Sequence, residues 1–251
     1  MSCECEQVVF GSILGDGSIR LDEKYKNARF SVKHSAKYHE YIFWKINCLH
    51  EIAPKKDFVN QNLLQNLTIS FQSSACELVT GIFNLVAKHK KVEVRRKWLN
   101  KLTPLGLCVW WLDDGSLITN NKGILCTESY SYDEHLLIVR YFRKVWKIDL
   151  KIIKRNLGYR LLFNTTELKK LLMIVLPYIP VRCMLYKGIL LYKDSEMQER
   201  WISEVERLSC FKRNEIEEIV FERKQVLKRF SQGKMISEND IVHTHSNMGR
   251  I

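Results

Sequence analysis

Glycine and proline are scarce in this chain, with 11 glycines and four prolines among 251 residues. Both residue types interrupt helices and strands, so their scarcity argues against long flexible linkers and favours regular structure over most of the sequence. The glycines that do occur are therefore informative. Four of them, Gly11, Gly15, Gly17 and Gly115, lie at or beside two acidic turns.

The chain also lacks a long apolar run. A helix that crosses a bilayer needs about 20 apolar residues, and the sequence has no such stretch, so we expect no membrane partner. The N-terminus lacks the basic segment, apolar core and small-residue cleavage site of a secretory signal. We predict an intracellular protein that is not secreted, in a bacterial or phage cytoplasm or in an organelle such as a mitochondrion or chloroplast.

The eight cysteines include no CxxC pair, and this absence excludes the common zinc-site spacings. Acidic residues are few as well: 40 Lys and Arg stand against 28 Asp and Glu, a formal net charge of +12. An excess of that size favours an acidic partner, and nucleic acid is the first candidate. With 46% apolar residues, the chain is long enough to bury one large core or two smaller ones.

Two segments of similar pattern are present, VFGSILGDG at residues 9–17 and LCVWWLDDG at residues 107–115. Each is apolar nearly all round, which predicts a buried helix that ends at an Asp-Gly turn. Pro104 fits the first turn of the second helix. The segments after the two turns are also alike, and we predict two copies of helix, two strands, helix, two strands, helix.

The predicted elements of the first copy are two strands, a helix, two more strands and a helix that Ser73 and Ser74 would cap at its N-terminus. Their predicted ranges are 18–21, 28–33, 36–52, 57–61, 66–72 and 73–88, and those of the second copy are 115–118, 123–127, 132–146, 149–154, 159–164 and 165–176. We divide the chain into a first half (1–90), a basic linker (91–102), a second half (103–194) and a C-terminal helical extension with a polar tail (195–251).

The two acidic turns suggest chemistry. A carboxylate at the C-terminal end of a helix is unfavourable, because that end already carries partial negative charge. If the two buried helices pack on each other, Asp16 and Asp114 would meet and form a hard-oxygen site suited to Mg²⁺, with Mn²⁺ as a possible substitute. Such a site can support phosphodiester cleavage. A single Asp-Gly is usually only a turn, but here the pattern is repeated.

These residues resemble the two signature helices of a single-chain LAGLIDADG homing endonuclease, and the repeat pattern matches that family over about residues 5–193. The resemblance implies an α+β fold of two pseudo-symmetric αββαββα halves, packed through the motif helices. Each half would lay a curved antiparallel sheet in the DNA major groove. It also implies that the eighth motif position, Asp16 and Asp114, carries the metal-binding carboxylates.

The resemblance implies further site residues. Gly15 and Asp113 lie beside the metal position: Gly15 would reach the metal through its carbonyl at most, and Asp113 would either support the metal ligands or have a structural role. The family places a basic residue near each active site, for which we choose Lys91 and Lys187; phosphate contact or solvation is the alternative. The DNA-contacting candidates are polar side chains, mostly on the strands, together with nearby basic residues: Arg20, Arg29, Ser31, Lys33, Gln61, Ser70, Gln72, Lys90, Lys122, Lys151, Lys154, Arg160 and Asn164.

The leading hypothesis is a site-specific, Mg²⁺-dependent endonuclease that cuts both strands of DNA at a long asymmetric target and leaves staggered ends. Asymmetry follows from two non-identical halves in one chain, which would act as a monomer. The alternative is a maturase that binds intron RNA and assists splicing, with or without DNA cleavage. A transcription regulator is disfavoured because both acidic turns are retained.

Overall fold

The computed structural model describes residues 1–54, 59–62, 68–89, 91–118 and 120–231. No helix within these ranges combines the length and the apolar composition that a membrane span requires.

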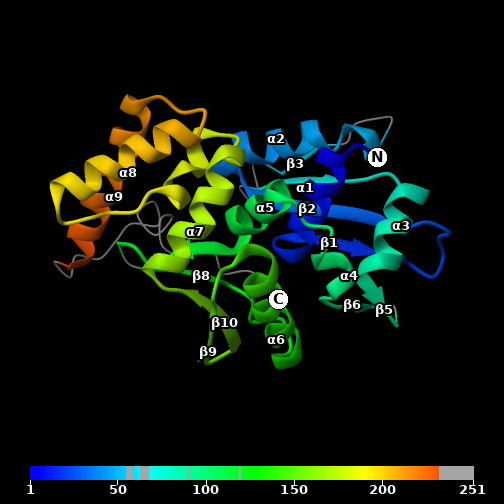
Figure 1. The fold of residues 1–251 in the computed structure, drawn as a ribbon. Coiled ribbons are helices and arrows are strands. Elements are labelled where there is room, and N and C mark those ends of the chain that lie inside the picture. The colour runs from blue at the N-terminus through cyan, green and yellow to red at the C-terminus, as the bar shows by residue number, and fades with distance from the viewer. Residues whose placement is uncertain (55–58, 63–67, 90, 119, 232–251) are drawn as a thin grey trace.

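The first half follows the predicted order of elements (Figure 1). Its helices and strands are α1 (Cys3–Leu14), β1 (Gly17–Arg20), β2 (Arg29–Ser35), α2 (His39–Cys48), β3 (Val59–Asn62), β4 (Thr68–Gln72) and α3 (Glu77–Val86). The strands form one antiparallel sheet in the order β1-β2-β4-β3. Single turns of 3-10 helix flank α2, so the predicted helix at 36–52 is one α-helix between two tighter turns.

The second half repeats this arrangement. Its elements are α5 (Pro104–Asp114), β7 (Gly115–Leu117), β8 (Gly123–Leu125), α6 (Tyr132–Tyr141), β9 (Lys151–Arg155), β10 (Gly158–Phe163) and α7 (Thr165–Val175). The sheet order is β7-β8-β10-β9, which matches the first half strand for strand. The predicted α+β fold with two pseudo-symmetric halves is therefore confirmed, and Pro104 occupies the first turn of α5 as expected.

Strand register relates the two halves residue by residue. The last glycine of the first motif, Gly17, pairs with Val32, and the last glycine of the second, Gly115, pairs with Leu125. Val32 and Leu125 are therefore equivalent positions. The next helices start in step, because α2 begins at His39 and α6 at Tyr132, each seven residues after its equivalent position.

The halves meet through α1 and α5, which lie side by side in the middle of the molecule (Figure 1). Both helices are buried along most of their length, as their apolar sequences predict. The backbones approach closely at Gly11: a Cβ added there would lie 2.4 Å from the carbonyl oxygen of Gly106. Gln7 of α1 ties the helices further, donating to the Lys101 carbonyl and accepting from the amide of Thr103.

One capping prediction was wrong. The helix α3 begins at Glu77, after Cys76, and neither Ser73 nor Ser74 caps it. Ser73 instead extends the pairing of β4 with β2: its amide donates to the Phe30 carbonyl and its hydroxyl accepts from the Phe30 amide. Because the chain is still extended at Ser73, this residue hydrogen-bonds to the neighbouring strand and does not cap the helix.

Between the halves, the structure adds elements that sequence patterns did not predict. They are the short strands β5 (Ala87–Lys88) and β6 (Lys91–Val92) and the helix α4 (Arg96–Leu99). Trp98 and Leu99 of α4 are fully buried, so the basic segment 91–102 contributes to the core as well as carrying charge. The boundaries of the four predicted regions stay a prediction.

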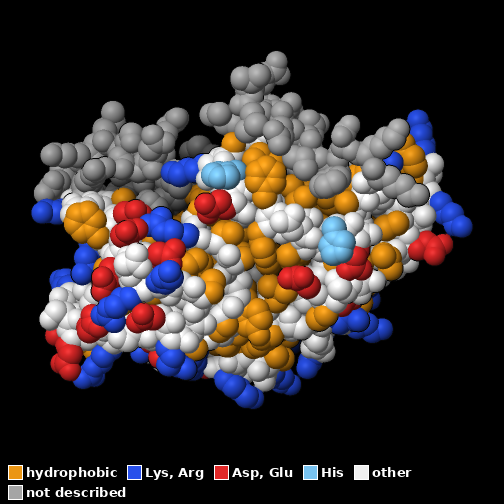
Figure 2. All heavy atoms as spheres, turned by 90° about the horizontal axis from the view of Figure 1, so that it is seen from above, with side chains coloured by type: hydrophobic (Ala, Val, Ile, Leu, Met, Phe, Trp, Pro, Cys, Tyr) orange, Lys and Arg blue, Asp and Glu red, His pale blue; other side chains and the backbone are white. Residues whose placement is uncertain are grey.

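After α7, the chain continues through the 3-10 turns η4 (Leu176–Tyr178) and η5 (Arg182–Gly188) into the predicted helical extension, α8 (Ser195–Leu208) and α9 (Arg213–Ser231). Figure 2 shows Lys and Arg interspersed with Asp and Glu over this part of the surface. Arg213, for example, pairs with Glu199 and Glu217. Residues 232–251, in the predicted polar tail, lie outside the described residues.

The close approach at Gly11 leads to a prediction. Gly11→Ala should destabilise the fold by about 1–3 kcal/mol, because the new methyl group would overlap backbone and force the motif helices apart. Gly81→Ala is the matched control: Gly81 is exposed in α3 and has no atom within 4 Å of an added Cβ, so alanine should be neutral or stabilise by about 0.5–1 kcal/mol. Urea unfolding measures both, and equal effects would contradict the close packing.

Candidate active site at the two acidic turns

The two acidic turns lie together at the ends of the packed helices. The amide of Asp16, two residues after α1, faces Asp113 Oδ2 at 3.4 Å across the interface. Gly15 makes this contact possible, because a Cβ added there would lie 2.4 Å from the Cβ of Asp113. Gly15 and Asp113 are the seventh residues of the two motifs. Because Gly15 has no side chain, the side chain of Asp113 can pack against it.

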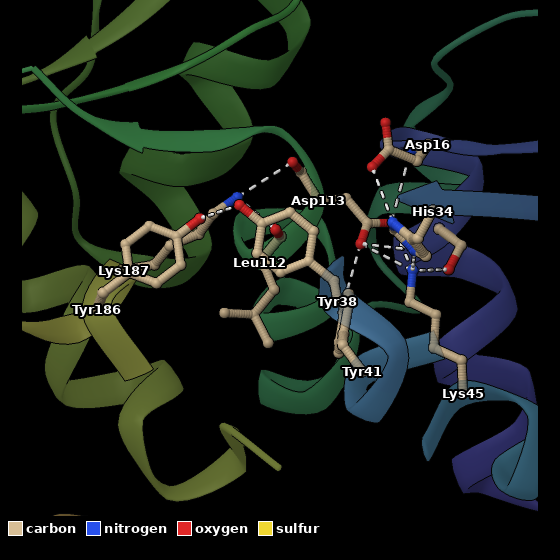
Figure 3. A network of polar contacts seen from close by, with 10 residues as sticks. Asp16, His34, Tyr38, Tyr41, Lys45, Leu112, Asp113, Tyr186 and Lys187 are labelled. Atoms are coloured by element: carbon tan, nitrogen blue, oxygen red, sulfur yellow. Dashed lines mark hydrogen bonds and ion pairs between the residues drawn. The ribbon is translucent and has the colours of Figure 1, made fainter. Parts of the chain in front are cut away.

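Asp113 is held by a buried lysine (Figure 3). Lys45 Nζ, from α2, donates to both carboxylate oxygens of Asp113 at 2.7 and 2.8 Å, and the hydroxyl of Tyr41 donates to Oδ1 at 2.9 Å. The side chains of Lys45 and Asp113 are both completely buried. Burial and the neighbouring Asp113 carboxylate raise the pKa of Tyr41 well above its ordinary value, so Tyr41 stays a donor.

Lys45 also contacts two other groups of the first half. Its ammonium donates to Ser12 Oγ of α1 at 2.9 Å and lies 3.1 Å from His34 Nε2 of β2. An ammonium has donors only, so His34 Nε2 must accept and the ring proton must lie on Nδ1. Burial, and then the Lys45 cation, lower the pKa of His34 to about 3, so the ring is neutral. Its Nδ1 faces Asp16 Oδ2 at 3.5 Å.

Asp16, His34 and Asp113 bring three potential metal-ligand atoms within 4.8 Å of one another. Distance alone would allow a cation there, but the Lys45 ammonium already occupies both oxygens of Asp113. A metal ion at this point would sit against a buried positive charge. Asp113 is therefore part of a buried ion pair. The metal role of Asp16 and Asp114 stays a prediction.

On the other side of the site lies Lys187, in η5 (Figure 3). It is nearly fully buried, and its Nζ donates to the carbonyl oxygens of Leu112 at 2.5 Å and Asp113 at 3.2 Å, at the C-terminal end of α5. A cation at this end offsets the partial negative charge of the helix. Burial lowers the pKa of Lys187, while Asp16, Asp113 and Asp114 act to raise it.

The other predicted basic residue is placed differently. Lys91 is exposed in β6, where it pairs with Lys88, and no described contact joins it to Asp16 or Asp114. Lys90 lies outside the described residues. Sequence reasoning missed Lys45, the buried lysine that contacts Ser12 and Asp113. A signal was present, because Lys45 shares the helix face of the apolar residues Tyr41, Ile42 and Ile46.

Six of the first-half DNA candidates share the sheet face that points away from the core. Along β2, Arg29, Ser31 and Lys33 alternate with the buried Phe30, Val32 and His34. Their partners in the ladder add to the same face, since residues paired across strands point to the same side. These pairs are Arg20 with Arg29, Ser31 with Gln72, and Lys33 with Ser70. Gln61 belongs to β3, but its side chain lies outside the described part of the structure.

The second sheet divides its candidates. Lys151 and Arg160 share the face opposite the buried Leu161, whereas Lys154 pairs with Tyr159 and lies on the other face. Arg155, which sequence reasoning did not select, takes the outer face instead. Arg160 also pairs with Glu128. Of the remaining candidates, Asn164 caps α7 and Lys122 is exposed just before β8.

Comparison with known proteins shows which family the chain belongs to. The sequence profile described as the LAGLIDADG DNA endonuclease family matches residues 6–171. The chain therefore belongs to that family, as its two motifs predict. The DNA endonuclease I-ChuI of Chlamydomonas applanata is 25% identical over 209 aligned residues, covering 72% of this chain and 93% of that protein.

Two further relatives extend the comparison. Protein RecA of Mycobacterium gastri is 27% identical over 197 residues, covering 72% of this chain and 46% of RecA, so the chain spans a little under half the length of that relative. The solved structure of the homing endonuclease I-WcaI bound to its DNA recognition sequence matches with a TM-score of 0.66 and 19% identity, covering 76% of this chain and 88% of the other. At this identity the likeness concerns the fold.

The buried ion pair predicts a large stability effect. Lys45→Met should destabilise the fold by about 3–5 kcal/mol, because it leaves the Asp113 carboxylate buried without its cation. Lys170→Met is the matched control: Lys170 pairs with Glu167 but is 44% exposed, so its loss should cost at most about 1 kcal/mol. Urea unfolding of both variants measures the difference, and similar losses would argue against the buried pair.

His34 predicts a pH dependence. Its pKa is about 3 in the folded chain against an ordinary value of 6.5 when unfolded, so below pH 6.5 the unfolded chain binds a proton that the folded chain does not. Stability should therefore fall as pH falls, by about 2 kcal/mol from this residue between pH 7 and pH 5. Metal-free urea unfolding of wild type and His34→Gln at both pH values tests this, and parallel losses in the two would contradict it.

Proposed function

We propose that this protein is a site-specific endonuclease that hydrolyses phosphodiester bonds in both strands of double-stranded DNA. The observation that carries the proposal is the site itself: a member of the LAGLIDADG DNA endonuclease family retains both motif aspartates, at the ends of two helices packed against each other. A chain used only for binding would not need both carboxylates at this junction.

The DNA partner is supported by charge and by the sheets. The chain carries a formal net charge of +12, and the outer face of the first sheet presents Arg29, Lys33 and Arg20. Phosphate contacts of this kind make affinity fall steeply as salt rises. I-WcaI, which has the same fold, was solved bound to its DNA recognition sequence.

The motif carboxylates fit a divalent metal by their chemistry. Asp16 and Asp114 supply hard oxygen donors, which Mg²⁺ and Mn²⁺ prefer, and the Asp16 side chain is 38% exposed and so accessible to solvent and DNA. A bound divalent ion would supply an activated water and stabilise the leaving oxygen. In this proposal Lys187 contributes a positive charge beside the carboxylates, held in place by the Leu112 and Asp113 carbonyls.

Several finer properties belong to the same proposal. The two halves are not identical in their polar groups, so a single chain would read a long asymmetric target and cut it as a monomer, leaving staggered ends. Each acidic turn would serve one strand. We place this activity inside the cell, where a recognition site in genomic DNA would be found. Lys91 and the remaining sheet residues would contact phosphates or bases.

The experiment is an in vitro selection on a randomised duplex library with Mg²⁺, followed by sequencing of the cut ends. We expect one long asymmetric site, with the cleavage rate reduced at least about 100-fold in Asp16→Asn and in Asp114→Asn, since each removes a charge that stabilises the reaction. Asp133→Asn, at an exposed position in the first turn of α6, is the control and should cut like wild type.

One result would overturn the proposal, and a further measurement would then identify its replacement. Tight DNA binding without cleavage in either Mg²⁺ or Mn²⁺ would leave a binding protein. If the chain then bound intron RNA and promoted its splicing, the maturase alternative would replace the nuclease.

A further inference from the structure

A continuous polar chain joins the second motif helix to the carboxylate of the first turn (Figure 3). It runs from Asp113 of α5 to Lys45 of α2, on to His34 of β2, and ends at Asp16. Exposure of the side chains rises along it, from 0% at Asp113 and Lys45 to 7% at His34 and 38% at Asp16. The polar chain thus leads from the core to the solvent-facing part of the site.

The direction of each contact follows from the donors available. The three protons of the Lys45 ammonium face four acceptors, so one proton is shared by the two Asp113 oxygens and the other two go to Ser12 Oγ and His34 Nε2. His34 can therefore present only its Nδ1 proton to Asp16 Oδ2, at 3.5 Å. A donor fixed in this way favours one orientation of a carboxylate that is otherwise exposed to solvent.

In the second half, the positions equivalent to His34 and Lys45 carry different residues. Val32 and Leu125 are equivalent by register, so His34 corresponds to Thr127, each two residues further on. Thr127 hydrogen-bonds to His135 and lies near the Tyr159 carbonyl, within its own half. Lys45 is the seventh residue of α2, and the seventh residue of α6 is the buried Ile138.

We propose that His34 is a positioning residue for Asp16, and that Lys45 and Asp113 hold its ring in the orientation that donates from Nδ1. The inference rests on the proposed endonuclease function. His34 contacts the acid of the first turn, and Lys45 links His34 to Asp113 of the second motif helix, whereas the equivalent residue Thr127 contacts His135. Loss of His34 should therefore impair one strand's cleavage more than the other's.

The first measurement needs no DNA. A long-range ¹H–¹⁵N correlation spectrum of the full chain reports the tautomer of each of the seven histidines, and the signal absent from His34→Gln identifies His34. We expect a neutral ring with its proton on Nδ1 at pH 7.5. A proton on Nε2 would overturn the proposal, because Lys45 could not then anchor the ring. This result comes from the wild-type chain, so it does not depend on how well any variant folds.

The second measurement follows both strands of a supercoiled plasmid that carries the selected site. His34→Leu should slow one strand by about 10- to 100-fold and so accumulate nicked circles. His34→Gln, whose amide can both donate and accept, should recover most of that rate. Thr127→Val is the matched control at the equivalent position and should produce no strand bias. Circular dichroism and urea unfolding check that each variant is folded.

The outcomes separate the two proposals. Equal slowing of both strands, or no slowing, in a folded His34→Leu chain would overturn the positioning role and leave the endonuclease intact. A wild-type chain that cuts no DNA would overturn the endonuclease and, with it, any role of His34 in catalysis.

Discussion

The packing of α1 against α5 is the constraint on which the rest of the structure depends. The helices approach so closely that Gly11 lies against the backbone of Gly106 and Gly15 against the side chain of Asp113. Because each helix ends at an acidic turn, the same contact that builds the shared core also brings two negative groups to one place. Core packing and the chemistry of the site therefore cannot be altered independently.

Two buried lysines, one from each half of the chain, offset the negative charge of this site. Lys45 comes from the first half and pairs directly with a carboxylate, whereas Lys187 comes from the second half and binds carbonyl oxygens at the end of α5. Burying a charge without a partner costs several kcal/mol. Both cations are supplied with acceptors, which allows the junction between the halves to be buried and still carry aspartates.

Much of the fold followed from local sequence. The two Asp-Gly turns, the apolar motif helices and the alternation along residues 29–33 are short-range patterns, and the structure has helices and strands where they predict them. Contacts between elements distant in sequence were less accessible. The sequence predicts only that His34 is one of the strand residues that point toward the core. Its contacts with Lys45 and Asp113 are visible only in the structure.

The same limit explains the other differences. Trp98 and Leu99 stand in a strongly basic segment, and charge composition gave no sign that they are buried. Lys154 and Arg160 both occur in predicted strands, but only the pairing register reveals that they point to opposite faces. Lys187 was selected through family resemblance, and its burial against the end of α5 is a tertiary feature.

The ion pair between Lys45 and Asp113 has a consequence for how such a chain can change over time. The lysine belongs to the first half and the aspartate to the second, so each half on its own has a charge without its partner. Recombination that joined either half to a counterpart with an apolar residue at the partner position would strand a buried charge at the new junction. We therefore expect Lys45 and Asp113 to be retained or replaced together during evolution, although the two halves have the same fold.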